Sequence, residues 1–307
     1  MKKNRLIIAT RESPLALWQA NWVKIQLEAL HPTLSIELLG LTTTADKLLS
    51  VPLYKTGGKG LFVKELEEAL LAKKADIAVH SMKDVPMDLP PDLCIPVMCE
   101  REDPRDAFVS NEYTSLTDLP ENAVVGTSSL RRQSQILAAR SDLQSSFLRG
   151  NVNTRLEKLD QKNYHAIILA AAGLKRLGLG SRIRSFLPID EMLPAAGQGV
   201  LGIECRTNDE EILALISPLN NLQSIQCVTA ERAVCRYLQG GCHVPIAAYA
   251  EKIDNQLRLQ ALVATAKGDR IIRSNAADNP AQAETLGIRV AKDLLRQGAQ
   301  SLLDTLA

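Results

Sequence analysis

Residues 5–30 read RLIIATRESPLALWQANWVKIQLEAL, and the order of residue types in them decides the fold class. The run from Arg5 to Thr10 is short and apolar, as in a buried strand. Ser13 follows as a plausible N-cap with Pro14 at the first helical position, and apolar residues then recur at helical spacing. A strand, a polar turn and an amphipathic helix form the repeating unit of a mostly parallel α/β sheet.

The same unit recurs over the first two-thirds of the chain. Strands are expected at residues 36–41 and 75–80, the second ending in His-Ser-Met-Lys-Asp. Strand, polar turn and helix follow again in VVGTSSLRRQSQILAAR (124–140), SSFLRGNVNTRLEKLD (145–160) and HAIILAAAGLKRLGL (165–179). Between these units, residues 42–60 are rich in Thr, Gly and Lys with weak periodicity, which predicts a mobile loop.

Two breaks in the pattern indicate domain boundaries. CEREDPRD (99–106) leads into a second α/β unit, and LPAAGQG (193–199) leads into a strand that returns to the first. From about residue 218 a helix, three alternating strands and a last helix predict a smaller α+β unit. The expected domains are therefore residues 1–99 with 200–217, residues 100–199, and residues 218–307.

The composition excludes several classes of function. The chain has 307 residues, a net charge of +1, and only 4% aromatic residues. No field of the whole molecule draws it to nucleic acid or to anionic lipid, and too few aromatic residues are present for base stacking. The apolar run after the basic start is too short for a signal peptide, and no segment approaches a membrane span. We therefore expect a cytoplasmic protein.

The cysteines are predicted to bind no metal and to form no disulfide framework. The six cysteines form no CxxC pair and have no metal-ligand spacing. Five occupy apolar or helical contexts that are typical of core residues. Cys242 differs, because it lies in GGCHVP (240–245), directly after two glycines that end a helix. A cysteine presented in such a loop is a candidate catalytic thiolate or an attachment point for a prosthetic group.

Basic and hydroxyl residues gather at the carboxyl ends of the expected strands. In open α/β sheets ligands bind at this edge, where helix N-termini also point free N–H groups. The residues are Arg11 and Ser13; Lys83 and Asp84; Thr127, Ser128, Ser129, Arg131 and Arg132; Arg149, Asn151 and Arg155; and Lys175 and Arg176. In a chain of almost zero net charge, this local excess predicts a polyanionic ligand.

Asp84 is the single acid of this basic set. It is either a partner of Lys83 or a helix cap, or a carboxylate that stabilises a cation developing during a reaction. No second carboxylate neighbours it in the sequence, so a pair of acids acting as acid and base is not indicated. His80 ends a buried strand and is interpreted as a core histidine with satisfied hydrogen bonds.

Several of these stretches together resemble the motifs of porphobilinogen deaminases, also called hydroxymethylbilane synthases. The resemblance runs from residue 5 to about residue 250, in the same order as in the family. Its most specific motifs are ADIAVHSMKDVP (75–86), VGTSSLRRQSQ (125–135), LRGNVNTRLEKLD (148–160), LPAAGQGVLGIECR (193–206) and GGCHVPIAAYA (240–250).

The resemblance implies a fold, a reaction and a cofactor. The fold is two α/β domains like those of periplasmic binding proteins, one of them discontinuous, and a small α+β C-terminal domain, in a monomer. The reaction joins four porphobilinogen molecules head to tail with loss of ammonia. The growing chain is built on a dipyrromethane cofactor that is held by a thioether to Cys242 and bears acetate and propionate groups.

Matching the motifs residue by residue implies a set of site residues. Asp84 takes the place of the catalytic aspartate, which stabilises positive charge on pyrrole nitrogens. The cofactor would be held by Lys83, Thr127, Ser128, Ser129, Arg131, Arg132 and Arg155. The substrate would be held by Arg11, Ser13, Gln19, Arg149, Asn151 and Arg176. Lys55, Lys59 and Phe62 would lie on or beside a loop over the site.

Departures from the family pattern are small, and two other functions compete. Glu12 replaces a more usual Gln beside Arg11, and Ala45, His243 and Ala247 also differ from the familiar residues. A non-catalytic anion sensor of the periplasmic-receptor type would explain the basic turns but not Cys242, Asp84 or the third unit. A transferase with a cysteine nucleophile would need a base beside Cys242, and none is evident in the sequence.

Overall fold

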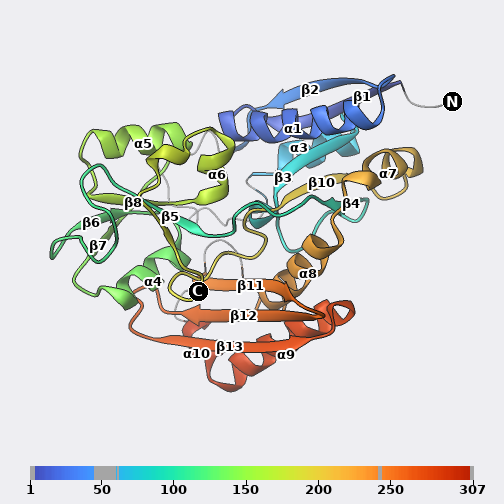
Figure 1. The fold of residues 1–307 in the computed structure, drawn as a ribbon. Helices are drawn as coiled ribbons and strands as arrows, with labels where there is room; N and C mark the ends of the chain where they lie inside the picture. Colours follow the sequence, from blue (N-terminus) through green and yellow to red (C-terminus); the bar gives the residue numbers. More distant parts are fainter. Residues whose placement is uncertain (1–3, 45–59, 61, 241–243, 305–307) are drawn as a thin grey trace. The chain divides into compact units, whose positions relative to one another are not determined.

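The computed structural model describes residues 4–44, 60, 62–240 and 244–304 of the chain (Figure 1). The chain divides into two compact units. Unit 1 comprises Met1–Leu49, Lys59–Arg101 and Val200–Ile225, and unit 2 comprises Ser50–Gly58, Glu102–Gly199 and Gln226–Ala307. Unit 1 is therefore discontinuous in the sequence. Each unit is described separately below.

Unit 1 is built on one mixed sheet of five strands in the order β2-β1-β3-β10-β4. Its strands are β1 (Arg5–Arg11), β2 (Ser35–Leu41), β3 (Ile77–Ser81), β4 (Leu93–Met98) and β10 (Leu201–Arg206). β1 pairs in parallel with β2 and β3, whereas β10 is antiparallel to both β3 and β4. Residues from two distant parts of the chain therefore share one sheet.

Helices cover both faces of this sheet because its strands are apolar on both sides. α1 (Pro14–Leu30) and α7 (Glu210–Ile216) pack on the face that carries Leu6 and Ile8, and α3 (Lys64–Leu71) packs on the opposite face. Two short 3-10 helices follow elements of this unit: η2 (Met82–Asp84) follows β3, and η4 (Ser217–Leu219) follows α7. Burial on both faces is typical of a sheet with parallel strands.

Unit 2 contains a second five-stranded sheet, in the order β7-β6-β8-β5-β9. The strands are β5 (Asp106–Val109), β6 (Val124–Gly126), β7 (Gln144–Ser146), β8 (Ala166–Ala170) and β9 (Ser185–Leu187). β6, β7 and β8 run parallel, and each is followed by a helix: α4 (Leu130–Ala139), α5 (Val152–Asp160) and α6 (Ala171–Arg176). α4 packs on one face, and α5 and α6 on the other. A 3-10 helix, η3 (Gly180–Arg182), precedes β9.

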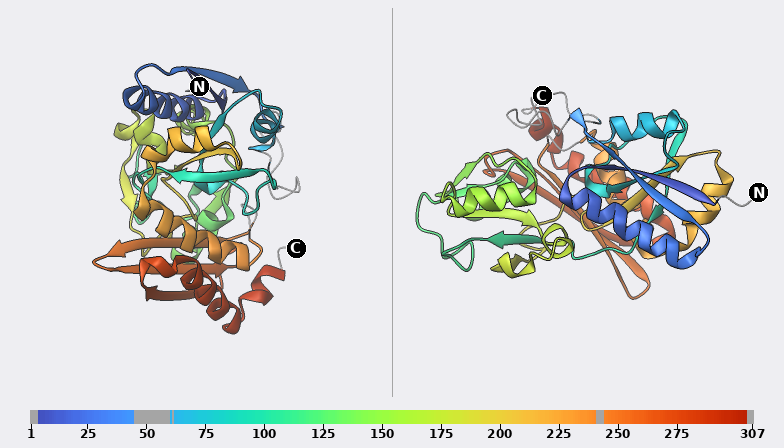
Figure 2. Two further views of the ribbon diagram at one scale, coloured as in Figure 1. Left: turned by 90° about the vertical axis from the view of Figure 1, so that its right-hand side faces the viewer. Right: turned by 90° about the horizontal axis from the view of Figure 1, so that it is seen from above.

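The C-terminal part of unit 2 is an antiparallel meander with helices against it (Figures 1 and 2). It comprises α8 (Leu222–Tyr237), β11 (Ile246–Ile253), β12 (Gln256–Ala264), β13 (Ile271–Asp278), η5 (Pro280–Gln282), α9 (Ala283–Arg296) and α10 (Ala299–Asp304). α9 lies so close to α8 that a Cβ on Gly287 would come within 2.4 Å of the Ala230 carbonyl oxygen. Two α/β sheets and a smaller α+β part confirm the predicted fold class.

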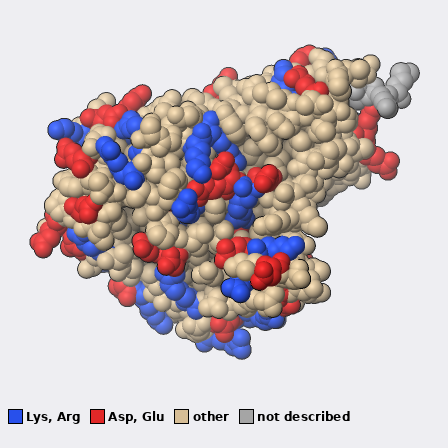
Figure 3. All heavy atoms as spheres, in the orientation of Figure 1, with Lys and Arg blue, Asp and Glu red and all other residues tan. Residues whose placement is uncertain are grey.

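Two further expectations concern cysteines and membranes. Cys99, Cys205, Cys227 and Cys235 are buried and Cys94 is half-buried, and all five are free thiols, as predicted for core residues. None of the helices within the described ranges combines the length and apolar character that a membrane span requires. On the face shown in Figure 3, Lys and Arg are interspersed with Asp and Glu.

A buried carboxylate ties the segment before β10 to the C-terminal meander. Glu231 on α8 is completely buried, and its Oε2 accepts a hydrogen bond from the Gly197 N–H at 2.7 Å. Its Oε1 accepts one from the Ala250 N–H on β11 at 2.8 Å. Gly197 has a φ of +75°, a conformation that favours glycine. One side chain therefore satisfies two backbone donors that would otherwise be buried without partners.

Removing this carboxylate should destabilise unit 2. We predict that Glu231→Ala lowers the free energy of unfolding by about 3 kcal/mol or more, because hydrogen bonds to a charged group contribute ~1.5–3 kcal/mol each. Urea unfolding followed by circular dichroism measures the change. Glu284→Ala, which removes an exposed glutamate from α9, should change it by less than about 0.5 kcal/mol. Equal effects of the two substitutions would contradict this role of Glu231.

Candidate active site

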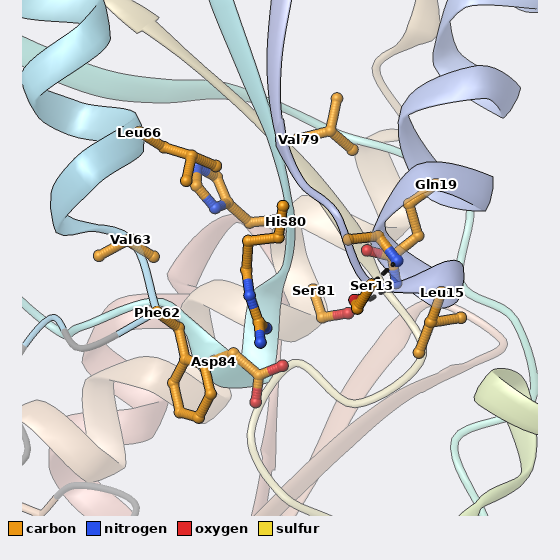
Figure 4. A pocket seen from close by; sticks show the side chains of 12 residues that line it. Ser13, Leu15, Gln19, Phe62, Val63, Leu66, Val79, His80, Ser81 and Asp84 are labelled. Atoms are coloured by element: carbon orange, nitrogen blue, oxygen red, sulfur yellow. Dashed lines mark hydrogen bonds between the residues drawn. The ribbon is translucent and has the colours of Figure 1, made fainter. Parts of the chain in front are cut away.

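A pocket opens in unit 1 where the parallel strands β1 and β3 end (Figure 4). Its polar lining comes from the β1–α1 turn, from α1, and from the end of β3 with the 3-10 helix that follows. The polar residues are Arg11, Ser13, Gln19, His80, Ser81 and Asp84. The apolar lining comes mainly from α1 and from the start of α3, and consists of Leu15, Ala16, Phe62, Val63, Leu66 and Val79.

The β1–α1 turn positions the residues that were predicted to hold substrate. Ser13 is the N-cap of α1, and its Oγ accepts a hydrogen bond from the Ala16 N–H at 3.4 Å. Pro14 occupies the first turn of the helix, as predicted. Gln19 lies one turn further on, and its Nε2 donates to Ser81 Oγ at 2.8 Å, which links α1 to the end of β3 (Figure 4). The structure therefore brings Arg11, Ser13 and Gln19 into one pocket.

Asp84 is placed by a tightly packed 3-10 turn. The Met82 N–H donates to the Val200 carbonyl at 3.0 Å, and the Met82 side chain is buried. A Cβ on Gly202 would approach Met82 Sδ to 2.2 Å, so β10 needs glycine where this turn lies against it. The turn presents the Asp84 carboxylate to the pocket beside Phe62 (Figure 4).

The wall opposite α1 combines a cation with an aromatic ring. The guanidinium carbon of Arg11 lies 4.9 Å from the centroid of the Phe62 ring, a cation–π contact. Arg11 and Asp84 line the same pocket, so it contains one fixed cation and one carboxylate. Glu12, the departure beside Arg11, takes no part in this wall, because its Oε2 accepts a hydrogen bond from Thr42 Oγ1 at 2.7 Å.

Acidic residues that the sequence analysis did not single out lie behind His80. His80 Nε2 and Glu204 Oε2 are 2.7 Å apart, and both side chains are buried. The expectation of a core histidine with a hydrogen-bond partner is therefore confirmed. Burial, and then the charge of Glu204, raise the pKa of the half-buried Glu67 on α3 to about 7. The sequence feature that could have identified Glu204 is the presence of an acid within the otherwise apolar strand sequence GIEC (202–205).

In unit 2, the predicted hydroxyl and amide residues shape the N-termini of two helices. Ser129 caps α4, where its Oγ accepts from the Arg132 N–H at 3.4 Å, and Asn151 caps α5, where its Oδ1 accepts from the Thr154 N–H at 3.0 Å. Thr127 Oγ1 accepts from the Ser129 N–H at 3.2 Å. Ser128 Oγ donates to the Leu148 carbonyl. Both helix N-termini lie at the carboxyl ends of parallel strands, where anions bind readily.

Arg131 and Arg132 form a buried ion cluster around Asp106. Arg131 Nη1 lies 2.8 Å from Asp106 Oδ2, and Arg132 Nη2 lies 2.8 Å from Asp106 Oδ1. Gln198 Nε2 also donates to Asp106 Oδ1, at 3.0 Å. Burial by itself would raise the pKa of the Asp106 carboxyl, but the two guanidinium groups lower it well below its ordinary range. Asp106 was not predicted from the sequence. The role of Arg131 and Arg132 in holding a cofactor stays a prediction.

The remaining predicted cations also contact the protein backbone or nearby acids. Arg155 Nε donates to the Gly150 carbonyl and Arg176 Nη2 to the Gly199 carbonyl, each at 2.8 Å. Lys175 forms ion pairs with Glu102 and Asp103 at 3.3 and 3.0 Å. Arg149 is buried, with its guanidinium carbon 5.9 Å from the Phe147 ring centroid.

The predicted residues are thus distributed over both units. Lys83 is half-buried in η2 of unit 1, whereas the other predicted cofactor ligands belong to unit 2. Lys55, Lys59 and Cys242 lie outside the described residues, as do Ala45 and His243. Ala247 is buried in β11. Within the described ranges, no group of three or more His, Cys, Asp or Glu residues could hold a metal ion.

The raised pKa of Glu67 has a testable consequence for stability. The unfolded chain ionises this carboxyl above its ordinary pKa of 4.5, but the folded chain does so only near pH 7. The folded state therefore binds more protons in this window, and stability falls as pH rises through it. We predict that Glu67→Gln leaves the free energy of unfolding unchanged near pH 4.5 but raises it at pH 8, by on the order of 1 kcal/mol after allowance for solvent screening. Urea unfolding at the two pH values measures the change. A gain of the same size at both pH values would contradict this.

Two solved structures are among those to which the chain is similar, each at a TM-score below 0.5. One is a putative methionine-binding lipoprotein from Bacillus subtilis, with 12% sequence identity, covering 71% of this chain and 91% of that chain, at a TM-score of 0.45. Another is the periplasmic aliphatic sulphonate-binding protein of Escherichia coli, with 16% identity, covering 78% of this chain and 71% of that chain, at a TM-score of 0.42.

Family models match most of the chain. Residues 6–214 match the model described as porphobilinogen deaminase, dipyromethane cofactor binding domain. Residues 225–296 match the model described as porphobilinogen deaminase, C-terminal domain. The first match alone includes the whole pocket of unit 1 and the turns before α4 and α5 of unit 2. The chain belongs to the porphobilinogen deaminase family, transferases of tetrapyrrole biosynthesis that are also called hydroxymethylbilane synthases.

Proposed function

We propose that the chain joins four porphobilinogen molecules head to tail into the linear tetrapyrrole hydroxymethylbilane and releases one ammonia for each unit added. The observation that carries the proposal is the pocket of unit 1, where the Asp84 carboxylate lies beside Phe62 and Arg11 provides a cation. The pocket therefore offers a carboxylate for a developing positive charge and a cation for an acidic side chain of the substrate.

Binding of the substrate is assigned to the groups around the start of α1. Porphobilinogen has an acetate and a propionate, and carboxylates are stabilised at a helix N-terminus by its free N–H groups and dipole. Arg11 adds a permanent positive charge, and an arginine can hold a carboxylate with two parallel hydrogen bonds. The hydrogen bond from Gln19 to Ser81 fixes two further polar groups of the pocket before substrate arrives.

Asp84 is the proposed catalytic residue. Loss of ammonia from the aminomethyl group and attack by a second pyrrole both place positive charge on pyrrole N–H groups. A carboxylate already fixed beside these groups stabilises that charge without reorganisation during the reaction. The packing of Met82 against Gly202 holds the turn that carries Asp84, so the carboxylate is positioned by the core of unit 1.

The residues of unit 2 fit a cofactor that bears several carboxylates. The N-termini of α4 and α5 supply free N–H groups and capped hydroxyl and amide side chains. Within the described ranges, the buried Nε of Arg131 has no hydrogen-bond partner, although its Nη1 is bound to Asp106. A buried donor of this kind would be satisfied by a carboxylate oxygen. The donor set therefore suits acidic side chains rather than a metal ion.

We assign the dipyrromethane cofactor to these groups together with Lys83, Thr127, Ser128, Ser129, Arg132 and Arg155, and its attachment to Cys242. When bound, the cofactor supplies the pyrrole to which the first porphobilinogen is added. Arg149, Asn151 and Arg176 are assigned to the carboxylates of substrate units. We further propose that the enzyme acts as a monomer in the cytoplasm.

The role of Asp84 predicts a specific kinetic defect. Asp84→Asn keeps the shape and removes the charge, so we expect kcat to fall by about 10²–10³-fold, as for loss of one preorganised charge-stabilising group. Asp84→Glu should retain more activity because it keeps the charge. Ammonia release from porphobilinogen and the yield of linear tetrapyrrole measure both variants.

The matched control is Asp92→Asn, which removes an exposed aspartate from the segment before β4. Its kcat should equal that of the wild type within about twofold, since surface substitutions away from a site have small effects. If Asp84→Asn retained a similar rate, the assignment of Asp84 as the charge-stabilising group would be wrong.

A further inference from the structure

A histidine–carboxylate pair lies at the inner wall of the pocket. In the antiparallel pairing of β3 with β10, Ala78 lies opposite Glu204 and His80 lies opposite Gly202. Because side chains alternate along a strand, His80 and Glu204 project from the same face of the sheet. Their side chains are 5% and 1% exposed and meet at 2.7 Å, through Nε2 and Oε2. His80 also lines the pocket that contains Asp84.

A contribution to stability alone does not explain why His80 and Glu204 are paired in the core. The second oxygen of Glu204, Oε1, is buried and has no hydrogen-bond partner within the described residues. A buried carboxylate is costly unless its oxygens are well satisfied, and apolar residues of similar volume are often as stable. Unsatisfied buried polar atoms are few in folded proteins and are found at functional sites more often than elsewhere.

The geometry leaves one ring nitrogen of His80 for proton exchange. Glu204 engages Nε2, which leaves Nδ1 as the ring nitrogen that can take up or release a proton. A buried carboxylate in this position orients the imidazole and stabilises the imidazolium that forms when the ring accepts a proton. Figure 4 shows the imidazole beside Leu66, at the α3 side of the pocket, and Asp84 beside Phe62.

Other charged groups near this pair come from every element packed against it. α3 contributes Glu67, whose pKa is raised to about 7 by burial and then by the charge of Glu204, whereas His80 acts to lower it. α3 also carries the exposed Glu68. β1 contributes Arg11, and the segment after β3 contributes Lys83 and Asp84. Arg206 at the end of β10 forms ion pairs with Asp76 and Asp209 instead.

We propose that His80, held by Glu204, accepts the proton that leaves the attacked pyrrole carbon in each coupling step. The inference rests on the proposed function. In that step the C–N bond of the protonated aminomethyl group breaks and ammonia leaves with the electron pair, while a C–C bond forms between the two units. The C–H bond of the attacked carbon then breaks, its electrons return to the ring, and the proton passes to Nδ1. His80 releases this proton to solvent before the next addition.

His80 and Asp84 therefore have different roles in the reaction, although they are only four positions apart in the sequence. Asp84 stabilises positive charge, whereas His80 takes up and releases one proton in each cycle. Glu204 acts through His80 and is a positioning residue. Lowering the pH should therefore slow the reaction by protonating His80 in advance.

The test compares kcat, KM and the pH profile of ammonia release for the wild type and for His80→Gln. The glutamine amide can still donate to Glu204 but cannot accept a proton. We expect kcat to fall by about 100-fold with KM within about threefold, in line with the loss of general-base catalysis. The acidic limb of the pH profile should disappear with it. Thermal melting of the same variant checks that it is folded.

One charge variant and one control make the test specific. Glu204→Gln removes negative charge beside the imidazole, so the acidic limb should move to lower pH. Glu68→Gln removes an exposed carboxylate from the neighbouring helix α3 and should leave the limb in place. The ¹⁵N imidazole resonance of His80, identified by its loss in His80→Gln, should shift its titration midpoint in the same direction in Glu204→Gln.

The outcomes distinguish this inference from the proposed function. Wild-type protein that releases no ammonia from porphobilinogen would overturn both. Normal ammonia release together with an unchanged kcat and acidic limb in His80→Gln would overturn the role of His80 alone. If His80→Gln did not fold, an unchanged limb and an unshifted imidazole titration in Glu204→Gln would overturn it equally.

Discussion

Parallel pairing of strands is the constraint on which the rest of the structure depends. β1 and β3 run side by side in the same direction, so the turn after each strand emerges at the same edge of the sheet. That edge receives Arg11 and Ser13 from one turn and Ser81 and Asp84 from the other, although some 70 residues separate them in the sequence. The parallel strands β6, β7 and β8 impose the same arrangement in unit 2, where the N-termini of α4 and α5 meet at one edge.

Buried carboxylates hold the segment of unit 2 that precedes β10. Asp106 binds two arginines of α4 and the Gln198 amide, and Glu231 binds two backbone N–H groups from segments that are distant in the sequence. Each carboxylate loses solvation on burial, and the charged or N–H partners offset this cost only when the geometry is close to ideal. Both networks surround the LPAAGQG segment (193–199), so the path of the chain back to β10 depends on buried charge rather than on apolar packing alone.

The sequence was sufficient for features that depend on local chemistry. The strand, N-cap and Pro14 of the first βα unit, and the two α/β sheets with a smaller α+β part, all follow from residue types and spacing. Arg11, Ser13 and Asp84 were expected in one site because parallel strands end together, and Gln19 was expected there from the family resemblance. The pocket of unit 1 brings the four residues together.

Contacts that depend on the pairing of distant segments could not be predicted from local residue types and spacing. Glu204 meets His80 only because β10 inserts beside β3, and Asp106 meets Arg131 only because β5 lies beside β8. No periodicity in the sequence specifies these pairings, so buried acids such as Glu204, Asp106 and Glu231 appeared as ordinary strand and helix residues. Burial likewise raised the pKa of Glu67 through neighbours that the sequence does not place beside it.

We propose that the tetrapyrrole is built on a primer attached to Cys242, and the intact mass of the protein under denaturing conditions tests this proposal. The purified protein should exceed its sequence mass of 33.5 kDa by two pyrrole units, or should gain them on incubation with porphobilinogen. Cys242→Ser should lack this increment, whereas Cys227→Ser, on the buried side of α8, should carry it. A wild-type protein that stays at its sequence mass after this incubation, or a Cys242→Ser protein that gains the same mass, would contradict the account.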